Sequence, residues 1–526
     1  MKKNTIKLFA LLLCLAMMFA LASCKKDTPP STSPDAPTNT ATPDVPTTPV
    51  RDTLNVAASN DNGTLDPIDI TGGWLQVIPA YAEALYVANS ETGERIWGLA
   101  TSIDAISEIE YTIHLREGVT FSNGNPFTAE DVLFTFNLCK DHPNKMLDVQ
   151  AVDFEKTKVI DDLTIDIWYT DYSVVNEDKL STCMIVDAES YDPVKMSLTP
   201  VGTGPYIVTD YVVNSHLSLV AREDYWGGEA PIKNLNFRVL NESSQITNAI
   251  EVGDVDIARV PTTDISYIES LGGFTIETVN TGYATAAYYN MSAGSLLGTK
   301  EARYAINYAT DRAAMVDVAY GGYAEVVNWP VSMGMKDYET RFANLNETYS
   351  VGYDLDKAKE YAETAGLVGK TIRVVTNGAA DYVTMAEILQ GDLGKIGITV
   401  EIQNFDQATY YSVIMDPSKY EIALYATACP SAMGADVMTN TFLFFTLGWE
   451  GKERDDYVAL GNKTLATFDA KERSDNLFEL AKQLVDYSPW YGICDTPSYT
   501  AIANGIDGFI TDLAGEVLYQ YLSYAS

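Results

Sequence analysis

The sequence predicts an α/β protein of two or three domains, on the evidence of length, composition and alternating strand and helix patterns. The chain has 526 residues, of which 46% are hydrophobic and 11% aromatic, so it can bury substantial cores. Between residues 355 and 402 a helical pattern, a strand pattern, a second helix and a second strand follow one another. This succession is typical of an α/β lobe.

The first 23 residues are predicted to be a signal peptide. Three lysines precede an apolar run over 8–21, which is too short for an ordinary membrane span. The run closes with Leu21-Ala22-Ser23-Cys24, which resembles the lipobox of bacterial lipoproteins. That resemblance implies a lipid on Cys24, which would hold the protein on a membrane without a spanning helix. A plain signal peptide with an incidental cysteine is the alternative.

Residues 24–52 form a stretch of Pro, Thr, Ser and Asp with almost nothing to bury. Such a composition predicts a solvated, disordered tether between the lipidated Cys24 and the folded chain. The mature fold is therefore predicted to begin at residue 53.

Acidic residues outnumber basic ones, with 72 Asp and Glu against 35 Lys and Arg, for a formal charge of −37. Removing residues 1–23, which contain three lysines and no acid, leaves an even larger excess of negative charge. Because such a surface repels phosphate backbones, the composition argues against a nucleic-acid partner.

The cysteines do not form a recognisable motif. Once Cys24 and the signal peptide are set aside, Cys139, Cys183, Cys429 and Cys494 remain, widely scattered and without a Cys-x-x-Cys pair. An oxidising compartment permits disulfides, and four cysteines allow three pairings that the sequence does not rank. Buried free thiols are the preferred interpretation.

A strand is predicted over residues 53–58, where Leu54 and Val56 alternate with polar positions. It runs into a polar turn that contains Asn60 and Asp61. Polar turns at the carboxyl ends of strands are where open α/β sheets collect ligands. These two residues are therefore candidate ligand contacts.

The segment from Tyr111 to Val132 is the most distinctive in the chain. Alternation over 111–115 predicts a half-buried strand, and Val119 with Phe121 suggests a second short strand. Thr128 and Asp131 fit a capping box, so a helix is predicted to follow and to bury Val132, Leu133 and Phe136. None of these residues forms a reactive set.

Further elements are predicted downstream. They are a strand over 164–169; a helix through Ala302, Ala305, Ile306, Ala309, Ala313 and Val316 that stops at Gly321-Gly322; helices ending at Gly366 and Gly397; strands around Val374 and Val400; and a helix through Leu477 and Leu484 that ends before Pro489.

Several of these segments resemble one known family. LREGVTFSNGNPFTAEDV at 115–132, GTGPY at 202–206 and EDYWGG at 223–228 are similar to landmarks of the extracytoplasmic solute-binding proteins of peptide and nickel ABC importers (family 5). AYAEALY at 80–86, EVGDVDI at 251–257 and KEARYAINYATDRAAM at 300–315 follow in the family's order. The resemblance covers roughly residues 54–510.

This resemblance implies a two-lobe, periplasmic-binding-protein-like α/β fold of class II, the large peptide-binding type. Lobe I is expected over 53–300 with an extra subdomain at about 71–200, lobe II over 301–488, and a return to lobe I over 489–526. The lobe crossings are expected near Tyr289-Asn290 and Pro489-Trp490.

No catalytic motif competes with this interpretation. No His-Glu-x-x-His, Gly-x-Ser-x-Gly or Ser-x-x-Lys nucleophile framework is evident in the predicted folded part of the sequence, and the whole chain has only three histidines. Zinc binding and direct nickel capture are therefore disfavoured, and neither a cofactor nor a metal site is predicted. The chain is expected not to be an enzyme.

The resemblance places eight residues at the expected cleft: Asn60, Asp61, Trp74, Tyr289, Asn290, Tyr425, Asp436 and Trp490. The chain departs from the family at one point. Peptide binders of the family typically carry a tryptophan and then an aspartate that meets the peptide's amino terminus. Here the positions look like Tyr425 and Ala428, and Asp436 is a possible substitute.

The expected function is that of a lipid-anchored, extracytoplasmic monomer that closes two lobes over a solute and delivers it to an ABC permease. Oligopeptide is the first ligand class, with an oligosaccharide or a metal chelate as alternatives. Loss of the aspartate puts zwitterionic dipeptides in doubt and leaves longer peptides and carbohydrates open. A secreted hydrolase and a non-transport adhesin or sensor are the alternatives from other classes.

Overall fold

The computed structural model describes residues 51–525, apart from 71, 144, 280, 328, 344, 346–351, 428–432, 442–445 and 447. The predicted signal peptide, Cys24 and most of the tether lie outside the described residues. Arg51–Ser526 forms one compact unit, and the description below concerns this unit alone.

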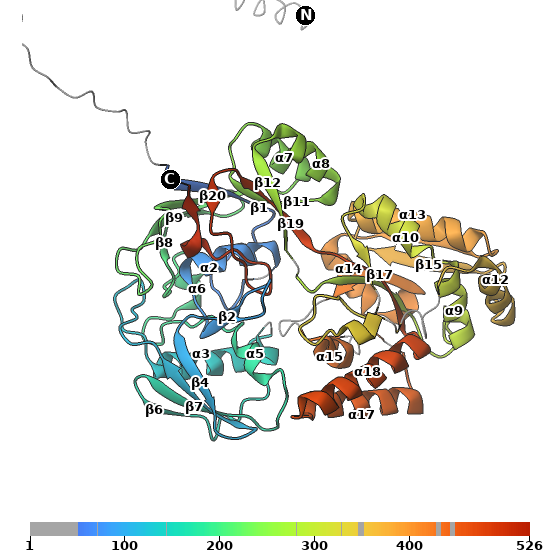
Figure 1. The fold of residues 1–526 in the computed structure, drawn as a ribbon, viewed down its shortest axis with the longest axis horizontal. Coiled ribbons are helices and arrows are strands. Elements are labelled where there is room, and N and C mark those ends of the chain that lie inside the picture. Colours follow the sequence, from blue (N-terminus) through green and yellow to red (C-terminus); the bar gives the residue numbers. More distant parts are fainter. Residues whose placement is uncertain are drawn as a thin grey trace, which may run out of the picture. The chain divides into compact units, whose positions relative to one another are not determined.

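The first lobe is built on a seven-stranded mixed sheet (Figure 1). Its strands, in spatial order, are β12 (Phe274–Val279), β19 (Ser498–Ala503), β11 (Ile257–Val260), β1 (Thr53–Ala58), β10 (Asn234–Val239), β9 (His216–Ala221) and β8 (Tyr206–Val212). Strand β1 lies parallel to both neighbours, with Leu54 opposite Leu235 and Val56 opposite Phe237. These four side chains are almost completely buried, so the sheet's centre is also the centre of a core.

Several short helices cover this sheet or join its strands. They are a 3₁₀ turn (Gly72–Val77), α2 (Ile78–Tyr81), α6 (Pro193–Met196), α7 (Ser243–Glu251), α8 (Thr262–Leu271) and a second 3₁₀ turn (Tyr519–Tyr521). Two small antiparallel two-stranded sheets complete the lobe, the hairpin of β2 (Tyr86–Ala88) with β3 (Arg95–Trp97) and the pair of β20 (Ile506–Asp507) with β21 (Ser523–Tyr524).

A separate four-stranded sheet with its own helices lies between β3 and β8 in the chain, and we call it the subdomain. Its four-stranded antiparallel sheet has the order β4 (Ala100–Ala105), β5 (Glu110–Leu115), β7 (Thr164–Trp168) and β6 (Lys158–Asp161). Helix α3 (Ala129–Lys140) packs against it, with α4 (Met146–Val149) and α5 (Asn176–Leu180) nearby.

The capping box of Thr128 and Asp131 is present, with the Thr128 backbone N–H donating to Asp131 Oδ2 at 2.8 Å. The strand expected at 119–121 is not formed. Only an isolated bridge joins Thr120 to Pro126, because Gly124 turns the chain back within a few residues.

The second lobe is built on a six-stranded mixed sheet. The strands, in spatial order, are β14 (Glu325–Val326), β18 (Trp490–Asp495), β13 (Ala284–Tyr289), β17 (Ile422–Thr427), β15 (Thr371–Thr376) and β16 (Thr399–Asn404). Strand β15 lies parallel to β16 and β17, whereas β13 is antiparallel to β17 and β18. The α/β interpretation of this half is confirmed.

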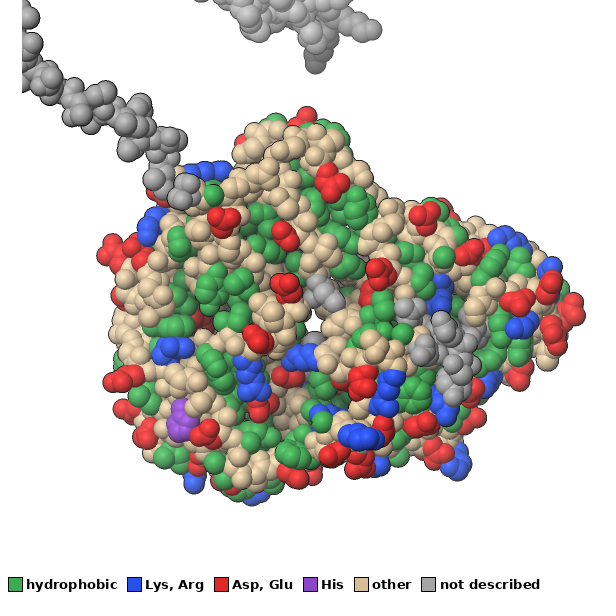
Figure 2. Space-filling view, in the orientation of Figure 1, with side chains coloured by type: hydrophobic (Ala, Val, Ile, Leu, Met, Phe, Trp, Pro, Cys, Tyr) green, Lys and Arg blue, Asp and Glu red, His purple; other side chains and the backbone are tan. Residues whose placement is uncertain are grey.

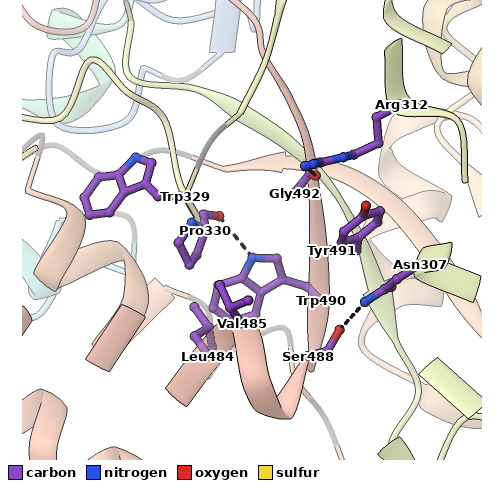
Figure 3. A pocket seen from close by; sticks show the side chains of 10 residues that line it. All are labelled: Asn307, Arg312, Trp329, Pro330, Leu484, Val485, Ser488, Trp490, Tyr491 and Gly492. Atoms are coloured by element: carbon purple, nitrogen blue, oxygen red, sulfur yellow. Dashed lines mark hydrogen bonds between the residues drawn. The ribbon is translucent and has the colours of Figure 1, made fainter. Parts of the chain in front are cut away.

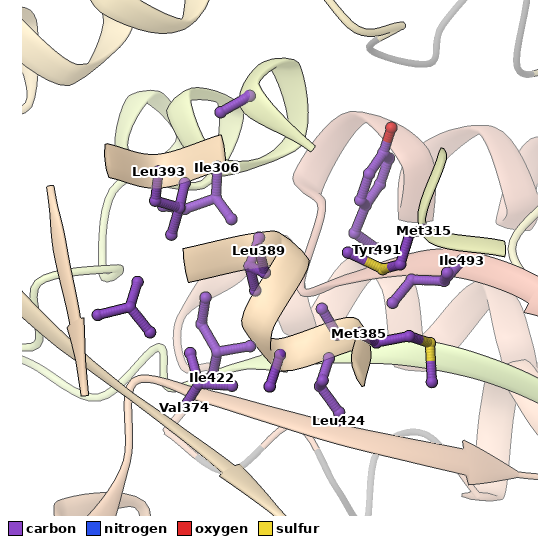
Figure 4. Close-up of a cluster of buried hydrophobic side chains, with 14 of the residues drawn as sticks. Ile306, Met315, Val374, Met385, Leu389, Leu393, Ile422, Leu424, Tyr491 and Ile493 are labelled. Carbon is purple, nitrogen blue, oxygen red and sulfur yellow. The ribbon is translucent and has the colours of Figure 1, made fainter. Parts of the chain in front are cut away.

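Helices lie on both faces of the second sheet. They are α9 (Lys300–Ala309), α10 (Arg312–Tyr320), α12 (Leu355–Thr364), α13 (Ala380–Gly394), α14 (Gln407–Ile414), α15 (Gly434–Asp436), α17 (Lys452–Ala466) and α18 (Ala470–Tyr487), with 3₁₀ turns at Thr340–Ala343 and Pro417–Lys419 and a π-helical turn at Val437–Thr441. Figure 4 shows one face, where Leu389 of α13 lies on the side of Ile422 and Val374 of the sheet and Leu393 lies beside Ile306 of α9.

The helix expected through residues 302–316 is two helices. Thr310 lies between α9 and α10 in an extended conformation, and the Asp311 side chain then accepts from Ala314 N to begin α10. Ala313, one of the positions in the predicted helical repeat, is exposed. Gly321 ends α10 in the left-handed conformation, as predicted.

The sheets also show where the chain passes between the lobes. Because β13 and β18 both belong to the second sheet, the described residues of the crossings are 281–283 and 496–497. These positions are several residues before Tyr289-Asn290 and several after Pro489-Trp490, where the sequence placed them. Thr496 N donates to Tyr283 O at 3.1 Å, so the two crossing segments are hydrogen-bonded side by side.

Candidate functional site

The predicted contacts in the first lobe have structural partners. Asp61 accepts hydrogen bonds from the Tyr211 hydroxyl (2.8 Å) and from Asn214 N (2.7 Å), and so fixes the β8–β9 hairpin. Asn60, beside it, is exposed. Trp74 is completely buried in the first lobe's core and stacks on Tyr211 at 6.1 Å. This placement gives Trp74 no exposed surface for a ligand.

Tyr289 and Asn290 stabilise the end of β13. The Tyr289 hydroxyl donates to Asn307 Oδ1 at 2.5 Å, deep in the second lobe. Asn290 Nδ2 donates to the carbonyl oxygens of Pro417 (2.5 Å) and Tyr420 (3.1 Å). Both side chains are therefore occupied in holding neighbouring segments together.

Tyr425 and Trp490 lie on the same face of the second sheet, on either side of Tyr288. The ring centroids of Tyr288 are 6.4 Å from Tyr425 and 6.2 Å from Trp490. Tyr425 is half-buried, and its hydroxyl donates to that of Tyr411, which is 44% exposed. Of the eight predicted residues, these two come together, and Tyr425 is the one with an exposed aromatic neighbour.

Asp436 is buried in α15 and accepts from Asn440 Nδ2 at 2.6 Å. Ala428, the position of the expected aspartate, lies outside the described residues. Whether Asp436 takes the part of that aspartate stays a prediction.

Trp490 also forms a wall of a cavity inside the second lobe. The cavity holds about 360 Å³ of empty space, part of it open to solvent, and its lining includes Asn307, Arg312, Trp329 and Ser488. Its polar groups bond to one another: Trp490 Nε1 donates to Pro330 O at 3.1 Å, and Asn307 Nδ2 to Ser488 Oγ at 2.7 Å (Figure 3). The cavity is thus a small gap within the packing of β18 and α18.

A larger cavity lies in the first lobe, and the sequence did not indicate it as a site. It holds about 510 Å³, partly open to solvent, between the β2–β3 hairpin and the C-terminal segment. Its lining includes aromatic rings, Met184 and two acids: Tyr86, Trp97, Tyr225, Trp226, Tyr521, Glu83 and Asp512. AYAEALY and EDYWGG, used above only to identify the family, supply four of these residues.

Glu83 is held in this cavity by its aromatic neighbours. The Tyr225 hydroxyl donates to Glu83 Oε1 at 2.7 Å, and Trp226 Nε1 donates to Oε2 at 3.0 Å. Burial raises the pKa of the Glu83 carboxyl, and the two donors act against that shift. The Arg116 guanidinium lies over the Trp226 ring, 3.9 Å from its centroid.

Asp512 is the second acid of this cavity, and its pKa is strongly perturbed. Burial raises the pKa of Asp512 to about 7, and the neighbouring Glu516 carboxylate adds to the shift. Asp512 Oδ1 accepts from the backbone N–H groups of Ala514 and Glu516, both at 2.9 Å. Among the described residues, its Oδ2 has no hydrogen-bond partner, so a ligand's cationic group could bind there.

We expect the stability of the protein to depend on pH through Asp512. The folded state holds this proton up to about pH 7, whereas an unfolded aspartate loses it near pH 4. Stability therefore falls as pH rises from about 4 to 7, because the buried carboxylate must ionise. Asp512→Asn should make the free energy of unfolding fall less over this range, by roughly 1–3 kcal/mol.

Urea unfolding at pH 5, 6, 7 and 8 would measure this difference. Glu91→Gln is the matched control, since Glu91 is exposed on the nearby hairpin loop. Equal slopes for wild type and Asp512→Asn would contradict the expectation.

The two lobes also contact each other through a segment that is distant in sequence from both crossings. We call residues 172–178 of the subdomain the latch segment. Val174 N donates to Leu465 O of the second lobe at 3.0 Å, and Asp178 pairs with Lys336 at 3.0 Å. The Tyr172 ring lies 5.5 Å from that of Phe468. The latch segment therefore joins the subdomain to the end of α17 and to the loop before α18.

Val175 makes the most buried of these contacts. It is 2% exposed and belongs to the core cluster of the second lobe, together with Trp329 and Leu477. Figure 2 shows the surface hollowed near the middle of the view, between the region of β2 and that of α14 and α15 in Figure 1. The lobes thus face each other across a hollow and are joined at the latch segment.

The described part of the chain contains no cluster of three or more His, Cys, Asp or Glu side chains that could hold a metal ion. Among the same residues, no helix has the length and apolar character needed to cross a bilayer.

Known proteins resemble this chain in sequence and in fold. Residues 96–451 match the model of the bacterial extracellular solute-binding proteins, family 5 (Middle). The putative ABC transporter peptide-binding protein BOV_A0352 of Brucella ovis is 23% identical over 377 residues, covering 69% of this chain and 70% of that protein. The nickel-binding periplasmic protein of Escherichia coli is 28% identical over 338 residues, covering 57% of this chain and 61% of that protein.

Solved structures show the same fold. The periplasmic binding protein DppA of Helicobacter pylori, in complex with peptide STSA, superposes with a TM-score of 0.76 at 21% identity, covering 91% of this chain and 99% of that one. The family match spans more than half of the sequence, and the two-lobe α/β fold agrees with it. The chain therefore belongs to the family 5 extracellular solute-binding proteins, which are transport receptors of ABC importers and not enzymes.

Proposed function

We propose that this protein is a lipid-anchored receptor that captures an oligopeptide by closing its two lobes and delivers it to the permease of an ABC importer. The observation that carries the proposal is the way the lobes are joined. The chain passes between the sheets at two neighbouring segments, and the latch segment makes a separate, non-covalent contact. A joint of this kind can open at the latch and bend at the crossings.

The crossings have the features of a hinge. They are short, they are hydrogen-bonded to each other through Thr496 and Tyr283, and Gly282 has a positive φ of 67°. A few residues at the ends of strands can absorb the backbone rotation while both sheets stay intact. A ligand that contacts both lobes would then stabilise the closed form.

The first-lobe cavity favours a peptide over a neutral ligand. Its aromatic rings suit apolar side chains, and the acids Glu83 and Asp512 suit an ammonium or guanidinium group, whose positive charge would favour their ionised forms against the effect of burial. Oligosaccharides also bind to aromatic rings, but a neutral sugar has no cationic group that could pair with Glu83 or Asp512. The relatives named as peptide-binding proteins agree with this choice.

A metal chelate is the second candidate, because one relative is named a nickel-binding protein. A chelate that carries its own ligands needs no cluster of protein side chains. The acids of the first-lobe cavity would repel an anionic chelate, so a neutral or cationic one would be required.

Native mass spectrometry of the protein, extracted from its own membranes without unfolding, tests the proposal. We expect a bound mass that is released by denaturation and fragments as a peptide. We also expect the N-terminal peptide to begin at Cys24 and to carry a lipid mass. Adding the identified ligand to ligand-free protein should reduce the radius of gyration measured by small-angle scattering.

Each part of the proposal can fail separately. A released sugar or metal complex would replace the peptide, and a free N-terminus upstream or downstream of Cys24 would rule out the anchor. A radius of gyration that does not change on ligand addition would exclude closure, and a chemically altered ligand would exclude a transport receptor.

A further inference from the structure

Residues 329–338 of the second lobe follow β14 and form neither helix nor strand, and we call this segment the strap. The Trp329 ring at its start is buried, and its Nε1 donates to Ser332 O at 2.9 Å. Pro330 O accepts from Nε1 of Trp490, one of the predicted ligand contacts, at 3.1 Å. The strap is therefore anchored at its start, and its later residues reach three other parts of the molecule.

The strap lies against both crossings between the lobes. Met333 N donates to Asp495 Oδ2 at 3.0 Å, and Asp495 is the last residue before the second crossing. At the first crossing, a Cβ added to Gly282 would lie 3.4 Å from Met335 Cε. A rotation of the lobes about the crossings would therefore change the surroundings of the strap.

The strap also reaches the first lobe. Lys336 Nζ and Asp178 Oδ2 of the latch segment are 3.0 Å apart, and the two side chains are 23% and 17% exposed. Partial shielding from water strengthens the attraction between two charges. Because the partners belong to different lobes, this ion pair must break when the latch opens.

The residue after Lys336 holds a turn that carries another predicted ligand contact. Asp337 Oδ1 accepts from Gly434 N at 2.6 Å, and Asp337 Oδ2 accepts from Ala435 N at 2.9 Å. These amides begin α15, which contains Asp436. Since the Asp337 carboxylate is the acceptor for both amides, its position helps to set the position of α15.

We propose that Lys336 is a positioning residue for the second-lobe ligand contacts. Its ion pair with Asp178 forms when the lobes close and fixes the strap, and Asp337 then holds α15 in the position in which Asp436 meets a ligand. Because Lys336 and Asp337 are adjacent in the chain, a displacement of one moves the other. The inference rests on the proposed capture by lobe closure and adds the residue through which closure reaches these contacts.

The coupling acts in both directions. If the ion pair favours the ligand-binding position of α15 by a given factor, a ligand bound at α15 favours the ion pair by the same factor. Because the pair joins the lobes, that ligand also favours the closed form. The strap thus makes the second-lobe contacts sensitive to the position of the first lobe.

Hydrogen exchange of the Gly434 and Ala435 amides in the mature protein, without added solute, tests the proposal. Asp178→Asn removes the charge that holds Lys336, so Asp337 should release these amides more often. We expect both amides to exchange about 3–10-fold faster in this variant, while the amides of the central strand β15 keep their rates.

Glu177→Gln is the matched control. Glu177 precedes Asp178 on α5 and loses the same charge, but it pairs with Arg95 of its own lobe. Exchange of the two amides should equal that of wild type in this variant.

Variants of Lys336 distinguish its charge from its packing. Lys336→Gln should accelerate exchange as Asp178→Asn does, whereas Lys336→Arg keeps the charge and should stay within about 2-fold of wild type. The double variant Asp178→Asn, Lys336→Gln should exchange no faster than either single variant, since all three lack the same ion pair.

Three results would overturn the proposal: wild-type exchange in Asp178→Asn, effects of the two single variants that add in the double variant, or equal acceleration in β15, which would assign the effect to the stability of the whole lobe. Failure of the proposed function has a different signature. A radius of gyration that does not change on ligand addition would exclude closure, whatever the exchange rates of Gly434 and Ala435 are.

Discussion

Gly204→Ala is expected to lower the free energy of unfolding by about 3–5 kcal/mol, the largest effect of any substitution considered for this chain. A Cβ at this position would lie 2.5 Å from the carbonyl carbon and 2.7 Å from the Cα of Tyr81. Backbone atoms cannot rotate away as a side chain can, so α2 or the turn itself would have to move. Urea unfolding and the yield of soluble protein measure the effect.

Glycine is required here by close packing, since Gly204 does not have a positive φ. Gly204 N also donates to Tyr81 O at 3.0 Å, which fixes the approach of the two segments. Gly391→Ala in α13 is the matched control, because a Cβ there meets nothing within 4 Å. It should stabilise the protein by about 0.5–1 kcal/mol. Equal stability of Gly204→Ala and wild type would show that the turn relaxes freely.

Val175→Asp is expected to have the second-largest effect. The substitution should weaken lobe closure and ligand affinity, whereas the stability of each lobe should not change. Val175 leaves the subdomain to enter the second lobe's core, so its burial is lost when the latch opens. The closed form would lose about 1.5–3 kcal/mol of apolar burial and would have to desolvate a carboxylate. The closed form is the one that binds ligand tightly, and the apparent affinity falls in proportion to its population. We therefore expect ligand affinity to fall at least about 100-fold.

Calorimetric titration with the co-purified ligand would measure the affinity, and small-angle scattering would measure the opening. Val194→Asp is the matched control: it lies in the same lobe, carries the same charge change and is already 76% exposed. Wild-type affinity in Val175→Asp would show that the latch segment does not contribute to closure. A large drop in melting temperature would instead show that Val175 stabilises a lobe.

Helix caps and strand patterns were predictable from the sequence because they depend on interactions between residues that are close together in the chain. The capping box at Thr128, the glycine ends of α10 and α13, and the alternation of β1 and β5 were read correctly, because each depends on residues a few positions apart. The break between α9 and α10 was missed. Periodicity continues across Thr310, and only the backbone reveals that the chain turns there.

The candidate site was predicted less well than the fold. Aromatic and polar residues after strands are good candidates in principle, yet Trp74 and Tyr289 are in cores because their sheets pack other elements over them. The first-lobe cavity joins Glu83 to Asp512, which are more than 400 residues apart in the chain. No local pattern could have brought that pair together.

The sequence by itself determined the family, the α/β class, the acidic surface and the order of most helices and strands, since these follow from composition, periodicity and short motifs. The tertiary structure alone decided which strands share a sheet, and therefore where the hinge lies. It also decided that Val175 reaches into the other lobe. That contact joins distant segments and is fixed by how whole elements pack, not by the residues beside it.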